Sequence, residues 1–243
     1  MTLAEILASL FPQGSSVVVE DGLIHGQGRR VDGSPLHVIG VCERRAVGID
    51  EAAKLARHVL EIIAGEDNAP ILVLIDSDSQ RMSKRDEMLG LNEFLAHLAK
   101  CLILADVLGH ATIGLLYGHT AAGAFIATAL ATRTLLALPG AEPVVMDLPS
   151  MARVTKLPIE TLQAMAKTTP VFAPGLANLA QTGAVAATLD PQRSLAAQVE
   201  EILVAGAREA GKDERDVLGK QRNGRPKAAD IALRVQELAR ASA

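Results

Sequence analysis

Aromatic residues are scarce in this sequence, and their scarcity limits what the protein can bind. The 243 residues include four Phe, one Tyr and no Trp, so the chain lacks the aromatic surfaces on which proteins stack the bases of single-stranded nucleic acid. The formal net charge of −4 supplies no overall positive field that would attract a polyanion. We therefore expect no nucleic-acid partner.

Cysteine is equally rare, and the chain has no clear membrane or export segment. Cys42 and Cys101 form no CxxC pair, so we expect two buried thiols in a reducing compartment. The first residues carry no basic segment of the kind that opens a secretory signal. Residues 111–132 lack charge, but the glycines among them favour a strand, a turn and a helix over a membrane span. We expect a cytoplasmic protein with no membrane partner.

What the sequence has is apolar aliphatic residues, in patterns that predict an α/β fold. Apolar residues make up 49% of the chain, enough for one large core. Residues 71–75 are continuously apolar, as in a strand that is covered on both faces of a parallel sheet. The predicted strands are 17–20, 36–41, 71–75, 111–116 and 133–138, and the predicted helices begin near Asp50, Ser83 and Thr120. We expect residues 21–35 to be a turn-rich connection and one long helix, capped by Ser83, to extend to about Ala105.

The last hundred residues have a different character. Prolines at 149, 158, 170 and 174 separate short helical segments that we expect to pack against the sheet without extending it. We predict a domain over residues 1–190 and a helical extension over 191–243. Lys220, Arg222, Arg225 and Lys227 form a basic stretch. It is either a solvated surface or a contact for an acidic carrier protein or a phosphate-bearing cofactor arm.

Two predicted strand-to-helix junctions are the candidate sites, because ligands of open α/β sheets bind beyond the carboxyl ends of the strands. The first is Ile75–Gln80 and the second is Tyr117–Ala124. Small residues allow a ligand to approach the backbone, and the start of a helix presents unpaired N–H groups to an oxyanion. Helix capping and tight packing of a helix on the sheet are the structural alternatives for the same residues.

Other chemistry is less well supported at these junctions. Gly118 and Thr120 resemble part of a nucleophile elbow, but that elbow needs a serine, and Thr120 suits a helix cap. Asp76 and Asp78 alternate as cation ligands could, yet no further acidic cluster completes the site, so we expect no metal. His119 is either a general acid or base or a residue that orients its neighbours.

A longer pattern resembles a known family. The run Met146–Glu160, MDLPSMARVTKLPIE, and the run Pro170–Gly175, PVFAPG, closely resemble the gamma subunit of malonate decarboxylase, as does GHTAAGAFIA at Gly118–Ala127. The resemblance extends from about Val17 to Asp190. It implies a crotonase-like fold of repeated ββα units, similar to the C-terminal half of biotin-dependent carboxyltransferases, with a helical C-terminal region.

The resemblance also implies an activity and partners. A beta subunit would share an interface site with this chain, and the family includes an acyl carrier subunit and an acyl-carrier transferase subunit. Malonyl-carrier thioester would become acetyl-carrier thioester and CO₂ without biotin. This subunit alone would bind no cofactor, because the coenzyme-A-like arm belongs to the carrier.

Such a reaction leaves negative charge on a thioester oxygen, which fixed N–H donors stabilise in the transition state. The candidate catalytic donors are the backbone amides of Thr120, Ala121, Ala122 and Gly123. The candidate substrate-binding residues are Ser77, Asp78, Gly118 and His119.

One departure from the related carboxyltransferases bears on this assignment. They often have adjacent glycines where this chain has Ala121 and Ala122. The chain is therefore either a catalytic subunit or a non-catalytic scaffold that completes the beta subunit's site and docks the carrier. A free-standing acyl-CoA hydratase or hydrolase is a third hypothesis, but neither glycine turn has a Glu pair or a Ser nucleophile nearby.

Overall fold

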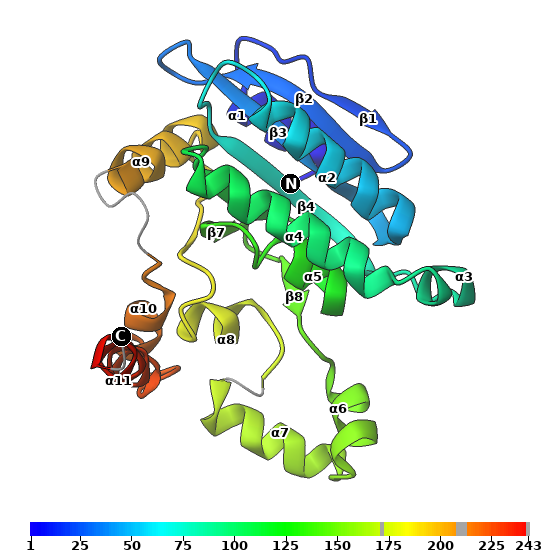
Figure 1. Cartoon of the computed structure of the whole chain (residues 1–243), viewed down its shortest axis with the longest axis vertical. Helices are drawn as coiled ribbons and strands as arrows, with labels where there is room; N and C mark the ends of the chain where they lie inside the picture. Colours follow the sequence, from blue (N-terminus) through cyan, green and yellow to red (C-terminus); the bar gives the residue numbers. More distant parts are fainter. Residues whose placement is uncertain (171–172, 208–212, 242–243) are drawn as a thin grey trace. The chain divides into compact units, whose positions relative to one another are not determined.

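The computed structural model describes residues 1–170, 173–207 and 213–241 (Figure 1). Its contacts group the chain into two compact units. Unit 1 consists of the described residues among 1–145 and 188–211, and unit 2 of those among 146–187 and 212–243. The predicted division at residue 190 differs from this grouping, because residues 146–187 belong with the C-terminal helices whereas α9 (Leu195–Ala207) belongs with the sheet.

Unit 1 is built on one mixed sheet whose strand order is β1-β2-β3-β4-β5-β7-β9. β1 pairs antiparallel with β2, and β2 with β3, whereas β3, β4, β5 and β7 are parallel. The bounds are β1 Val18–Glu20, β2 Leu23–Arg29, β3 Pro35–Val47, β4 Ile71–Gln80, β5 Thr112–Leu116, β7 Thr134–Ala137 and β9 Ala187–Thr188. All five residues Ile71–Ile75 are buried, as their continuous apolar pattern predicts.

Helices cover this sheet and supply the rest of the core. On one face α2 (Ile49–Ile63) packs against α4 (Leu91–Val107), and α4 against α5 (Ala122–Thr128) (Figure 1). Leu55 and Val59 of α2 and Leu98 and Leu102 of α4 are almost completely buried, because they recur at helical spacing on the faces that meet. α1 (Leu3–Leu10) packs against α9.

The structure corrects three local predictions. The glycine-rich connection at 21–35 contains a whole strand, β2, whose seven residues pair with β3. The long helix is broken at Gly90, whose φ of +83° favours glycine. Residues before the break form α3 (Lys84–Met88), and the Met88 side chain is 75% exposed. The helix expected to be capped by Asp50 has Gly48 as its N-cap.

Unit 2 consists of helices, among them a C-terminal pair, α10 (Arg215–Gln221) and α11 (Ala228–Ala241), that pack on each other. The other described helices are α6 Leu148–Thr155, α7 Ile159–Thr168 and α8 Leu176–Gln181. The Arg222 guanidinium donates to the carbonyl oxygens of Ala180, Val185 and Ala186, which ties the segment after α8 to α10. Lys220 forms an ion pair with Asp230 at 2.6 Å. Two of the four basic residues at 220–227 thus hold unit 2 together. No helix in the described ranges is both long and apolar enough to cross a membrane.

Substitution of Gly40 tests the close pairing of β3 and β4. A Cβ atom at this position would lie 2.2 Å from the Leu74 carbonyl oxygen, which is backbone and cannot move aside cheaply. We expect Gly40→Ala to lower the free energy of unfolding in urea by about 3 kcal/mol. Gly206→Ala is the matched control, because nothing lies within 4 Å of that Cβ and the helix gains up to about 1 kcal/mol. Equal stability of both variants would contradict the packing described here.

Candidate functional site

The two junctions identified in the sequence lie side by side in unit 1 and are joined by hydrogen bonds. β4 runs on to Gln80, beyond the end of its pairing with β5 at Ile75, and the short strand β6 (His119–Ala121) lies against this extension. The Asp76 carboxylate accepts the His119 N–H at 3.1 Å, and the Gln80 side-chain oxygen accepts the Gly123 N–H at 2.8 Å. Between them the hydroxyls of Ser77 and Thr120, both fully buried, are 2.8 Å apart. Each contact joins residues 43 positions apart, so the two segments run in one register.

Gly118 has a specific steric role at this place. A Cβ atom there would lie 2.2 Å from Oδ1 of Asp76. Glycine therefore lets the Asp76 carboxylate approach the turn and accept the next amide, that of His119. The space beside Gly118 therefore holds the Asp76 side chain, which is neither of the two structural alternatives, helix capping and tight helix packing.

The amides at the turn point in alternating directions. β6 pairs in parallel with β8 (Glu142–Val144), and the Glu142 N–H donates to the Gly118 carbonyl. In this register the ladder uses the amides of Thr120 and Ala122, so the Ala121 N–H points the same way as that of His119, toward β4. Ala122 has φ +48°, a left-handed conformation uncommon for a residue with a side chain. The helix expected at Thr120 therefore begins at Ala122.

His119 lies between two carboxylates. Its Nε2 is 3.9 Å from Oδ1 of Asp78, and its Nδ1 is 3.8 Å from Oε2 of Glu142. The ring is 20% exposed, and among the described residues Nδ1 is buried with no hydrogen-bond partner. Nδ1 of His119 therefore has a hydrogen-bonding capacity that no described residue uses.

Sequence reasoning missed several side chains around the junction. Asp76 and Gln80 belong to the predicted run, but only the extended conformation of β4 shows that they make the contacts to β6. Cys42 of β3 and Tyr117, directly after β5, lie on either side of Asp76 of β4 and on the same face. Burial raises the pKa of the Cys42 thiol to about 11 and that of Tyr117 well above its usual range. Neither group supplies a nucleophilic anion at neutral pH.

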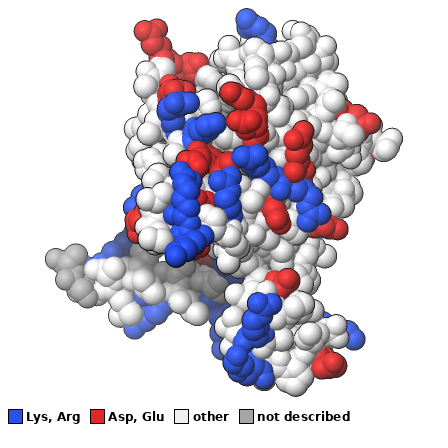
Figure 2. Space-filling view, turned by 90° about the vertical axis from the view of Figure 1, so that its right-hand side faces the viewer, with Lys and Arg blue, Asp and Glu red and all other residues white. Residues whose placement is uncertain are grey.

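The arginines that follow β4 do not offer a free binding site for a carboxylate. Glu51 is buried and accepts hydrogen bonds from Arg45 and Arg81, while Arg85 forms an ion pair with Asp50 at 2.8 Å. Positive and negative side chains alternate over the upper part of the molecule in Figure 2. These arginines therefore hold α2 and α3 to the end of β4.

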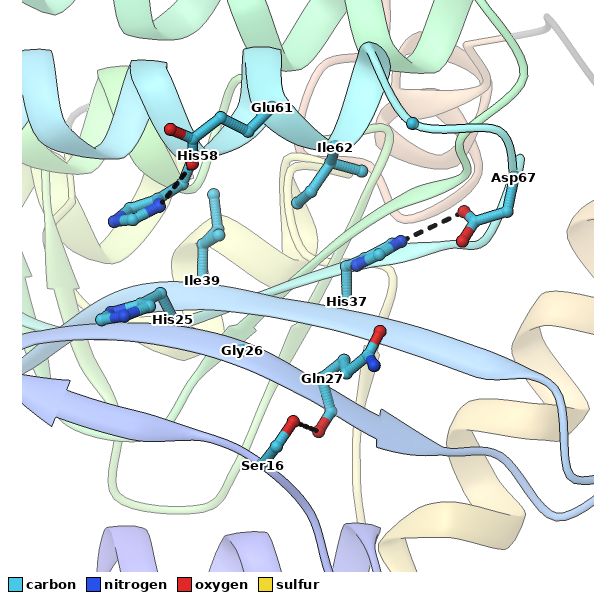
Figure 3. A pocket seen from close by; sticks show the side chains of 11 residues that line it. Ser16, His25, Gly26, Gln27, His37, Ile39, His58, Glu61, Ile62 and Asp67 are labelled. Atoms are coloured by element: carbon cyan, nitrogen blue, oxygen red, sulfur yellow. Dashed lines mark hydrogen bonds and ion pairs between the residues drawn. The ribbon is translucent and has the colours of Figure 1, made fainter.

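A pocket of about 410 Å³ lies between the strands β2 and β3 and the helix α2 (Figure 3). The rings of His25 and His58 stack there, with centroids 4.5 Å apart and an angle of 8° between planes. His58 contacts Glu61 at 3.2 Å, and His37 contacts Asp67 at 3.1 Å. His37 pairs with the first residue of β4, so the pocket lies toward the opposite end of the strands from the junction. The three histidines have no shared sequence spacing, which is why the sequence did not predict the pocket.

No group of three or more His, Cys, Asp or Glu in the described part of the chain is arranged to hold a metal ion. His97 and Cys101 lie in contact on α4, with the sulfur 3.7 Å from Nε2, but Cys101 is buried. Its pKa is raised by burial, which disfavours the thiolate that a metal needs.

Comparison with known proteins decides the family. The family model described as malonate decarboxylase gamma subunit matches residues 42–239. The chain belongs to this family. It is 31% identical over 196 residues to malonyl-S-ACP:biotin-protein carboxyltransferase MADD of Malonomonas rubra, which covers 74% of this chain and 67% of the relative.

Solved structures confirm the expected crotonase-like α/β fold. A chain of a Pseudomonas malonate decarboxylase hetero-tetramer in complex with coenzyme A is 26% identical, with a TM-score of 0.76 and 98% of both chains covered. A chain of the Pseudomonas MdcD-MdcE hetero-dimer is 24% identical, with a TM-score of 0.73 and coverage of 98% of this chain and 99% of that chain. Transcarboxylase 12S, at 19% identity and a TM-score of 0.66, shares the fold over 83% of this gamma-subunit chain and 40% of its own.

The stacked histidines of this gamma subunit predict a pH-dependent stability. Burial and the neighbouring His25 lower the pKa of His58 below its usual 6.5, although Glu61 opposes them. The unfolded chain therefore binds this proton more readily, and the free energy of unfolding should fall as the pH drops below about 6.5. His58→Gln should flatten that fall in urea titrations, whereas His97→Gln on α4 should keep it. An unchanged slope in His58→Gln would show that the stack does not couple to folding.

Proposed function

We propose that this gamma subunit pairs with a beta subunit to decarboxylate a malonyl thioester carried by an acyl carrier protein. Membership of the family supports malonate as the substrate unit. One observation carries the proposal: hydrogen bonds join the end of β4 to the segment that leads into α5. Backbone amides and His119 therefore lie at the carboxyl edge of a parallel sheet, where such sheets bind ligands.

The reaction requires stabilisation of a negative oxygen. The bond between the carboxylate carbon and the α-carbon breaks, CO₂ leaves, and the bonding electrons move onto the thioester oxygen to form an enolate. Amides fixed before the reaction stabilise this oxyanion more than the ground state. The Ala121 N–H, directed toward β4, is the first donor that we assign. The Gly123 N–H already binds one oxygen, that of Gln80, and becomes a second donor if the substrate oxygen replaces it.

A proton must then reach the α-carbon to give the acetyl thioester. We assign this proton to His119, whose buried Nδ1 has no hydrogen-bond partner among the described residues. Asp78 and Glu142 lie on either side of the ring, at 3.9 Å from Nε2 and 3.8 Å from Nδ1. Ser77 fixes Thr120 and thereby the direction of the neighbouring amides.

The proposed reaction requires three partner subunits: a beta subunit, an acyl carrier and an acyl-carrier transferase. The Pseudomonas relatives were solved as a hetero-dimer and as a hetero-tetramer with coenzyme A, which supports a beta subunit as the stable partner here. We propose that the acyl carrier presents the malonyl group on a coenzyme-A-like arm and that a transferase subunit loads the carrier. The cytoplasmic location stays a prediction.

The relative from Malonomonas rubra favours a second candidate function. That protein is named as a malonyl-S-ACP:biotin-protein carboxyltransferase, so the carboxyl group passes to biotin rather than leaving as CO₂. The match over nearly the whole length of a decarboxylase chain supports direct decarboxylation without biotin. A scaffold role, in which only the beta subunit is catalytic, is the alternative for this chain.

Gly123→Val in the reconstituted complex separates these possibilities. A Cβ atom at Gly123 lies 3.1 Å from the Leu95 side chain and 3.2 Å from the Gln80 side-chain oxygen, so the branched side chain must push aside the oxygen that accepts the Gly123 N–H. We expect CO₂ release from malonyl-carrier to fall by about 10²-fold or more, with the complex still assembled on size exclusion. Gly206→Val, at an open helix position, should retain activity.

Two results would contradict this assignment. Wild-type turnover by the assembled Gly123→Val complex would leave the scaffold role as the explanation. Loss of turnover by the unmodified complex in excess avidin would show that biotin takes part, whereas direct decarboxylation predicts no effect of avidin.

A further inference from the structure

Unit 2 has almost no apolar core of its own. Among its described residues only Leu162, Ala173, Val185 and Ala229 are buried and hydrophobic. Nine larger hydrophobic side chains are exposed: Met146, Val154, Leu157, Ile159, Val217, Ile231, Leu233, Val235 and Leu238. Burial of apolar surface is the main force that offsets the entropy of an ordered chain, so unit 2 lacks its usual source of stability.

The helices α6 and α7, which pack on each other, bury almost no hydrophobic side chains. No residue of α6 is buried, and Leu162 is the only buried residue of α7. Val154 is 68% exposed and Leu157 is 40% exposed. Local signals do form these helices, because Asp147 caps α6 and Lys156 ends it in a left-handed conformation. Helices of eight and ten residues are nevertheless marginal in water without tertiary packing.

We propose that unit 2 is the pairing module of this chain, and that the exposed apolar surface of α6 and α7 packs against the beta subunit. The proposal rests on the heteromeric complex of the proposed function. It names the surface of this chain that forms the complex. Arg153 and Lys156 flank Val154 and Leu157, so the matching surface of the beta subunit is an apolar groove bordered by carboxylates.

The observations favour the beta subunit over the acyl carrier as the occupant. A carrier protein must leave after each turnover, so it would cover these helices for only part of the time. A permanent subunit keeps them covered, as the largely hydrophobic interfaces of obligate complexes do. The Pseudomonas chain that is 26% identical over 98% of this one comes from a malonate decarboxylase hetero-tetramer.

Unit 1 offers a competing apolar surface and therefore a control. Ile103, Leu104, Val107 and Leu108 lie together on α4 and the residue after it, each between 42% and 72% exposed. This helix does not need a partner to be stable, because Leu98, Leu102 and Ala105 on its other face are buried in the core. If the beta subunit bound α4, substitutions on α4 would weaken pairing and those on unit 2 would not; binding to unit 2 predicts the reverse.

Two matched double variants test the proposal in the full chain co-expressed with the beta subunit. Val154→Asp with Leu157→Asp should weaken pairing by roughly tenfold or more, because the charges would be buried in the interface. Val107→Asp with Leu108→Asp introduces the same charges on α4 and should leave pairing unchanged. Pairing is measured by analytical ultracentrifugation. The reverse pattern would overturn the proposal, as would equal pairing by all variants.

Hydrogen exchange of the unmodified chain gives a second measurement that does not depend on any variant. The amides of residues 148–168 should exchange rapidly in the isolated chain and become protected when the beta subunit is added. Protection confined to α4, or none in 148–168, would overturn the proposal. A complex that shows this protection but releases no CO₂ would refute the proposed function and leave the pairing module supported.

Discussion

The alignment of β6 along the end of β4 is the constraint on which the candidate site depends. Three hydrogen bonds with the same offset of 43 residues hold it, and the central one is a buried contact between two hydroxyls. A buried hydroxyl without a partner costs about 1–3 kcal/mol, so Ser77 and Thr120 each require the other. If this alignment shifted by one residue, the amide directions at Ala121 and Gly123 would reverse, and His119 would no longer lie between Asp78 and Glu142.

The two units of the chain differ in how much of their hydrophobic surface they bury. Unit 1 buries a continuous set of Leu, Ile and Val between the sheet and its helices, and it can hold a site rigidly. Unit 2 is held by specific polar contacts, such as those of Arg222, and leaves most of its apolar surface uncovered. This contrast agrees with the two proposals, which place the site in unit 1 and the contact with the beta subunit in unit 2.

The sequence predicted those elements whose signals are local. The apolar run at 71–75 predicted β4, and small or polar residues directly after a buried strand indicated both junctions. Contacts that depend on register were not predictable, because nothing local shows that Asp76 and Gln80 meet His119 and Gly123. Glycines gave a wrong prediction of a turn-rich connection at β2, where Gly26 and Gly28 lie within a paired strand. The break at Gly90 was hidden by helical spacing that continues on both sides of it.

The most direct test of the central claim removes a single N–H group from the site. Incorporating lactic acid in place of Ala121 converts the backbone amide to an ester and leaves the methyl side chain unchanged. In the assembled complex we predict a fall of about 10²-fold in the rate of CO₂ release from malonyl-carrier, since one oxyanion donor is lost. An unchanged rate would contradict the claim that this chain stabilises the enolate.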